Sequence, residues 1–154
     1  KTSPKKIGMI AYKNSLIHME DRIGGFQEAS KSIESFIERV GFNAIEAEVE
    51  LALENLLQKK VEALFFATNS LAVAGLRVLQ QKNIKIPNEI AIASFDESEA
   101  FEFFYSPVSY IQQPINQMGT RALQLLLNKV NTPELQEKTE ILTAECVFRK
   151  SSQR

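Results

Sequence analysis

Short, continuous apolar runs alternate with longer segments of helical period, and this alternation constrains the fold of the 154-residue chain more than any other feature. The clearest runs lie at residues 7–12, 61–67 and 89–95. Such runs are typical of strands buried on both faces of a parallel sheet. Because parallel strands are joined by right-handed helical crossovers, the pattern predicts an α/β fold: a doubly wound, mostly parallel sheet flanked by helices.

The same periodicity assigns the segments around these runs. Helices are expected at residues 22–40, 48–60, 70–82, 96–104 and 115–130. Further strands are expected at residues 42–47, 108–112 and 141–148. Gly41 is placed to end the first of these helices in a left-handed cap. Asp96 and Glu99 have the spacing that caps the start of the fourth.

The composition excludes several function classes. Eighteen basic and nineteen acidic residues give a formal net charge of −1, which argues against this chain alone gripping a nucleic-acid backbone. The chain has one cysteine, Cys146, and one histidine, His18, too few for an internal disulfide or a metal site built from several such ligands. We therefore expect no metal and no cofactor. Cys146 lies in a predicted strand, where it is expected to be a small buried residue.

Targeting and catalytic motifs are missing as well. No apolar run approaches the roughly 20 residues of a membrane-spanning helix, and the polar start KTSPKK is unlike an export signal. The cytoplasm is the expected location, without a membrane partner. The sequence has no nucleophile elbow, P-loop or dinucleotide-binding glycine motif, and His18 and Cys146 lie on unrelated elements. We expect the protein not to be an enzyme.

The candidate binding residues follow the predicted strands, because ligands of doubly wound sheets bind beyond the carboxyl ends of the strands. The polar residues singled out there are Arg22, Asn69, Ser70, Asp96 and Gln113. This mixture suits a polyol such as a sugar, since each hydroxyl both donates and accepts hydrogen bonds. Helix capping is the alternative role for Asn69, Ser70 and Asp96. Arg22, at the start of a predicted helix, opposes the helix dipole, which favours a functional partner.

A series of segments, taken in order, carries a family resemblance. They are KIGMI (6–10), RIGGF (22–26), ALFFATNSLA (63–72), IPNEIAIASFD (86–96), QP (113–114), MG (118–119) and RKS (149–151). Together they resemble the LacI/GalR family of bacterial transcription repressors over nearly the whole chain. Three features depart from the family pattern: Ser70 replaces the usual Asp, Ser94 replaces the usual Gly, and the region 41–51 is short.

The resemblance implies a periplasmic-binding-protein-like fold, in which two α/β lobes enclose a small molecule. Residues 1–113 would form the second lobe, 114–140 a segment that returns to the other lobe, and 141–154 the last strand and tail. The DNA-binding helix-turn-helix would be absent from this chain. By position, Arg22, Asn69, Asp96 and Gln113 match residues that commonly contact the effector, with a weaker contact at Ser70. The implied partners are a sugar effector and, only through the missing domain, operator DNA.

The helix expected at 115–130 belongs to the first lobe in this family, so its apolar face lacks a cover here. We expect it to fold back onto its own lobe or to swap into a neighbouring chain. The resemblance also implies a homodimer. Its possible contact residues are Leu76, Leu79, Phe101, Phe104, Met118 and Leu125. For the phenylalanines, packing in the core is the alternative.

Two other function classes stay open at this point. An exported solute-binding protein that feeds a transporter would have the same architecture. A small flavodoxin-like enzyme or a phosphorelay receiver would share the alternation of strands and helices. A receiver needs an acidic cluster after its first strand, and Tyr12-Lys13-Asn14 does not supply one.

Overall fold

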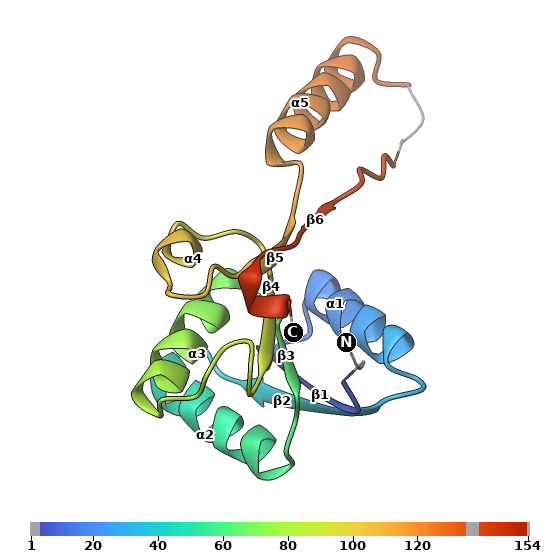
Figure 1. Ribbon diagram of the computed structural model, residues 1–154. Coiled ribbons are helices and arrows are strands. Elements are labelled where there is room, and N and C mark those ends of the chain that lie inside the picture. The colour runs from blue at the N-terminus through green and yellow to red at the C-terminus, as the bar shows by residue number, and fades with distance from the viewer. Residues whose placement is uncertain (1–3, 135–138, 154) are drawn as a thin grey trace.

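The computed structural model describes residues 4–134 and 139–153 (Figure 1). Its centre is a six-stranded sheet in the order β2-β1-β3-β4-β5-β6. The strands are β1 (Lys6–Tyr12), β2 (Glu34–Val40), β3 (Ala63–Phe66), β4 (Ala91–Phe95), β5 (Ser109–Gln112) and β6 (Glu145–Val147). All neighbouring pairs are parallel except β5 and β6, which are antiparallel. The predicted doubly wound, mostly parallel α/β sheet is confirmed.

Helices cover the two faces of the sheet unequally. They are α1 (Ile17–Ala29), α2 (Ile45–Gln58), α3 (Asn69–Gln81), α4 (Ala100–Phe103) and α5 (Ile115–Asn131), followed by a short 3₁₀ turn at Lys150–Ser152. Figure 1 shows α1 on one face and α2 and α3 on the other. This division follows from right-handed crossovers, because only the β1-to-β2 connection moves outward in the opposite direction along the sheet.

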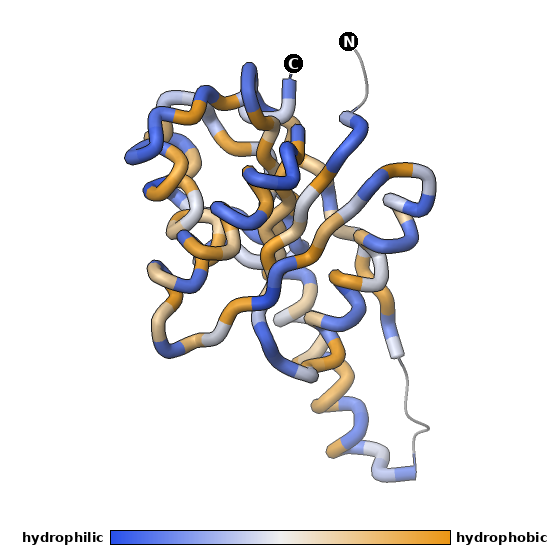
Figure 2. The backbone as a smooth tube through the Cα atoms, turned by 90° about the horizontal axis from the view of Figure 1, so that it is seen from below, coloured by the Kyte–Doolittle hydropathy of each residue, from blue (hydrophilic) through white to orange (hydrophobic). Residues whose placement is uncertain are grey.

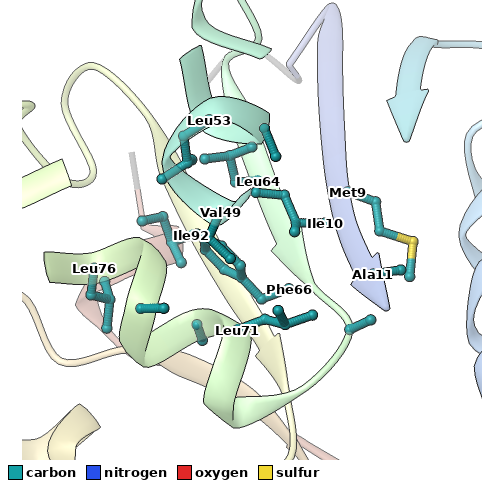
Figure 3. Packing of buried hydrophobic residues seen from close by; sticks show 14 of the residues in the cluster. Met9, Ile10, Ala11, Val49, Leu53, Leu64, Phe66, Leu71, Leu76 and Ile92 are labelled. Atoms are coloured by element: carbon teal, nitrogen blue, oxygen red, sulfur yellow. The ribbon is translucent and has the colours of Figure 1, made fainter. Parts of the chain in front are cut away.

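The main core lies between the sheet and the helices α2 and α3. Alternate strand residues, among them Ile10, Phe66 and Ile92, point toward these helices, as Figure 3 shows. Helix α3 approaches the sheet closely at Gly75, where an added Cβ would overlap the ring of Phe66. Met9 and Ala11 lie on the opposite, α1 side of β1 and are also fully buried. The central strand β1 is therefore buried on both faces, as its unbroken apolar run predicts.

The prediction of one helix over residues 22–40 is wrong. The chain forms α1, turns at residues 30–33 and continues as β2, which pairs with β1 in register from Lys6–Glu34 to Tyr12–Val40. Apolar residues of this edge strand happen to fall at helical spacing, and sheet pairing overrides that local signal. Gly41 consequently follows a strand instead of capping a helix, and its amide donates to Glu48 Oε2 at 2.6 Å. The strand expected at 42–47 is wrong too, since α2 begins there.

Helix α5 leaves the sheet and projects away from the rest of the molecule (Figures 1 and 2). None of its residues is buried, and large apolar side chains such as Leu126 (60% exposed) and Val130 (66% exposed) face solvent. The expectation that this helix folds back onto its own lobe is therefore wrong. Arg121 of α5 forms a bidentate ion pair with Glu140, which ties the helix to the returning chain.

The burial of the proposed dimer residues differs from one to the next. Leu76, Leu79 and Phe101 are buried inside this chain, so their side chains are closed to a partner and core packing is their role. Phe104 is half-buried and packs against Tyr105. Met118 and Leu125 lie on the projecting helix, with Met118 45% exposed.

Two further expectations at the carboxyl-terminal end need correction. The strand predicted over residues 141–148 is limited to β6, and Cys146 within it is exposed because β6 is the outermost strand of the sheet.

No helix among the described residues has both the length and the apolar character needed to cross a membrane.

Candidate functional site

Three of the predicted site residues meet where the strands end. Arg22 comes from α1, Asp96 follows β4 directly, and Gln113 follows β5 directly. Because β4 and β5 are parallel neighbours, their carboxyl ends place Asp96 and Gln113 side by side, and Gln113 Nε2 donates a short hydrogen bond to Asp96 Oδ1. Arg22 Nη1 lies 3.6 Å from Asp96 Oδ2. The structure thus joins a guanidinium, a carboxylate and an amide in one cluster, the edge cluster.

Arg22 is fixed from three directions. Its Nη1 donates to the carbonyl oxygen of Ala67 at 2.7 Å, beside the ion pair with Asp96. Its guanidinium carbon lies 3.8 Å from the centre of the Phe95 ring, a cation–π distance. Burial lowers the pKa of the Arg22 guanidinium, and the charge of Asp96 opposes that shift. Arg22 lies in the second turn of α1, not at its start, so its partners explain its position and the helix dipole does not.

Asp96 holds an uncommon backbone conformation. Its φ is +67°, in the left-handed region, which costs a non-glycine residue about 1 kcal/mol and is tolerated best by Asp and Asn. Its amide donates to Ile111 at 3.0 Å, which anchors the turn to β5. The predicted capping role of Asp96 is wrong, because α4 begins only at Ala100 and the residue before it, Glu99, makes no side-chain cap. The carboxylate is therefore turned toward the edge cluster instead of a helix end.

Asn69 and Ser70 lie at the same edge but face a different hollow. The cap of α3 is Thr68, whose Oγ1 accepts from the amide of Leu71 at 3.3 Å, so capping does not occupy Asn69 or Ser70. Asn69 Nδ2 donates to the carbonyl of Glu97 at 2.8 Å, which holds the loop after Asp96. Ser70 Oγ is 3.0 Å from the hydroxyl of Tyr12. Asn69 and Ser70 line a hollow of about 380 Å³ together with Ile45, Glu46, Val73, Ala74, Arg77 and Ser98.

A larger hollow of about 540 Å³ opens beside the edge cluster on the α1 side of the sheet. It is lined by His18, Asp21, Arg22, Gly25, Phe26, Phe65, Phe95, Ile111 and Gln113. The sequence analysis missed Phe65 and Phe95 as site residues, since both lie within apolar runs that predict buried strands. The two-residue period of a strand is the signal that could have found them. It turns Phe65 to the face of the sheet that Phe66 does not occupy, and Phe95 to the face that Ser94 does not occupy.

A third, more polar hollow of about 430 Å³ lies where the chain leaves the sheet for α5. It is lined by Glu97, Gln112, Gln113, Pro114, Ile115, Asn116, Gln117, Thr143 and Glu145. Gln113 lines this polar hollow and also the hollow of about 540 Å³ on the α1 side, so the edge cluster lies between these two. Within residues 4–134 and 139–153, no group of three or more His, Cys, Asp or Glu side chains could hold a metal ion.

Comparisons with known proteins match nearly the whole chain. The profile of the periplasmic binding protein-like domain family matches residues 4–152. The ribose operon repressor of Haemophilus influenzae is 29% identical over 66% of this chain and 31% of its own length. The PurR transcriptional repressor of Actinobacillus pleuropneumoniae is 25% identical over 96% of this chain and 46% of its own length.

A solved structure agrees with this match. A LacI family transcriptional regulator from Bifidobacterium animalis superimposes with a TM-score of 0.82 at 23% identity, over 97% of this chain and 55% of its own. The chain belongs to the periplasmic binding protein-like domain family, in the form that LacI-type regulators carry, and the LacI/GalR resemblance of its motifs is confirmed. It spans 31% to 55% of the length of these relatives.

Proposed function

We propose that this chain is the effector-sensing part of a LacI/GalR-type transcription regulator and that its effector is a sugar. The edge cluster carries the proposal: Arg22, Asp96 and Gln113 converge where proteins of this architecture bind ligands. The family match supports the regulator class. The name of the ribose operon repressor, to which the chain is similar, supports a sugar as the first effector class to test.

Each residue of the site has a role that follows from its chemistry. The remaining N–H groups of Arg22 would donate to ring hydroxyls, and Asp96 would accept from one or two of them. Gln113 supplies one donor and one acceptor group on a single side chain. Asn69 is a candidate contact at the margin of the cluster, where it also positions the loop that carries Asp96. Ser70, hydrogen-bonded to Tyr12, would contact the effector weakly.

The proposed organisation follows the same family. Residues 1–113 would form one lobe, 114–140 a segment of a second lobe, and 141–154 the last strand and tail. The projecting α5, with its exposed apolar residues, supports this division, because such a surface is usually covered in a folded protein. Operator DNA would be bound through a separate domain, as a homodimer and in the cytoplasm, where the DNA is.

Sensing would work by a shift between two arrangements of the lobes. A ligand changes such an equilibrium only when it binds one arrangement better than the other. The edge cluster would supply that difference, because its hydrogen-bonding groups can be fully paired only when the second lobe closes the site over the ligand.

Isothermal titration calorimetry of the protein as encoded by its gene, against a panel of sugars and nucleobases, tests the proposal. We expect a sugar to bind, with D-ribose the first probe. Arg22→Ala and Asp96→Ala should each weaken binding by roughly tenfold to a hundredfold, since each leaves a buried polar partner unpaired at about 1–3 kcal/mol. Lys31→Ala is the control, because Lys31 is exposed, lies outside the hollows described above and forms a surface ion pair with Glu28. Unchanged binding in both site variants would refute the site assignment.

A further inference from the structure

We propose that the edge cluster selects an uncharged effector and rejects its phosphorylated form. The inference rests on the proposed function and adds the charge class of the ligand to it. It starts from the Arg22–Asp96 ion pair, in which the single cation of the cluster is already matched by a carboxylate.

The charged side chains around the cluster are mainly acidic. Asp21 and Arg22 line the apolar hollow, Glu97 and Glu145 line the polar one, and Asp96 lies between them. One cation therefore stands against four carboxylates. Among the described residues, no lysine lines either hollow. A phosphate group placed at this edge would meet like charges in a site that is partly shielded from water, where their repulsion is least screened.

Arg22 is also a poor anchor for an anion because its charge is already balanced by the neighbouring carboxylate of Asp96. Its Nη1 is committed to the carbonyl of Ala67 and lies within reach of Asp96, and its guanidinium plane rests on the ring of Phe95. The N–H groups of Nε and Nη2 remain, but a phosphate that met them would meet a guanidinium whose charge Asp96 already balances. A pair of neighbouring hydroxyls needs less: one oxygen to accept from Arg22 and one hydrogen to reach Asp96.

The surroundings of the cluster fit an uncharged ring. The hollow beside Arg22 is walled by Phe26, Phe65 and Phe95, and the rings of Phe26 and Phe65 are stacked with their centres 6.5 Å apart. Aromatic walls bury the C–H face of a ring without any demand for charge. The edge cluster would then form hydrogen bonds with the hydroxyl groups along one edge of that ring.

The experiment compares each neutral sugar with its own phosphate ester. D-Ribose and D-ribose 5-phosphate, and D-glucose and D-glucose 6-phosphate, are titrated into the protein as encoded by its gene. We expect the neutral form to bind at least about tenfold tighter than the ester. Equal or tighter binding of the ester would overturn the proposal. If neither form of any sugar binds, the proposed sugar-sensing function itself is contradicted.

The variant Asp96→Asn tests whether the cluster causes the preference. Asn has the same shape and tolerates the left-handed backbone, so the fold should persist, which circular dichroism checks. Removing the carboxylate charge leaves the charge of Arg22 unbalanced. The ratio of the affinity for the neutral sugar to the affinity for its phosphate ester should therefore fall at least several-fold. Glu54→Gln, on the far helix α2, is the matched control and should leave the ratio unchanged. A ratio unchanged in Asp96→Asn would refute the assignment to this cluster.

Discussion

At the scale of single residues, the tightest constraint is the contact between α3 and β3. Gly75 leaves no room for a Cβ because the buried ring of Phe66 occupies that space. We expect Gly75→Ala to reduce the free energy of unfolding by about 1–3 kcal/mol, as overpacking of a core does. Gly24→Ala is the control: Gly24 is also helical but has open space around it, so the change should stabilise by up to about 1 kcal/mol. Chemical denaturation of both variants checks the opposite signs.

A second prediction for single residues concerns acid. Hydrogen bonds from Arg39 lower the pKa of the Glu20 carboxyl below its ordinary value of 4.5. A carboxyl whose pKa is lower in the folded state stabilises above its unfolded value, and that contribution is lost as the pH falls through the folded value. Because both side chains are exposed, the effect should be small. Glu20→Gln should be slightly less stable than the parent at pH 7 and equal to it at pH 2, as urea titrations at both values would measure. A difference that persists at pH 2 would contradict this account.

At the scale of elements, the sequence predicted the inner strands of the sheet and most of its helices well, but it missed β2 at one edge and overestimated β6 at the other. Unbroken apolar runs predict the buried strands. In β2, by contrast, the charged residues Glu34, Glu38 and Arg39 are interspersed with apolar residues whose spacing also fits a helix. Its identity depends on pairing with β1, which no local pattern contains. The positions of Asp96 and Gln113 followed from topology, since parallel strands end at one edge, whereas Arg22 reaches that edge from the second turn of α1. Phe95 was missed because its contact with Arg22 depends on which face the strand presents.

The other element that local pattern could not place is α5. Its amphipathic sequence predicts the helix but not what covers it. For the 154-residue chain by itself, we expect a second copy to cover the helix, so light scattering should report a dimer. Met118→Gln combined with Leu126→Gln should shift the chain toward monomer, because both residues are exposed apolar side chains of α5. Asn128→Ala, on the same helix, should leave the assembly intact. A parent chain that is monomeric in light scattering would refute the prediction that a second copy covers α5.

At the scale of the whole molecule, two segments far apart in sequence connect the sheet to the projecting part. The chain leaves through β5 and returns through β6, and these strands pair in register at Tyr110–Val147, Ile111–Cys146 and Gln112–Glu145. Gln113, the next residue after β5, belongs to the edge cluster and bonds to Asp96. The edge cluster and the connection to α5 are therefore adjacent in the chain as well as in space.

That paired connection limits the movements available to α5. A ribbon of two hydrogen-bonded strands bends readily across its flat face, but sideways bending or sliding of one strand past the other breaks its ladder. Helix α5 should therefore tilt relative to the sheet by a hinge motion about a single axis. A molecule bound by Gln113 and Asp96 would lie next to that axis, so a small displacement there would become a larger one at the far end of α5.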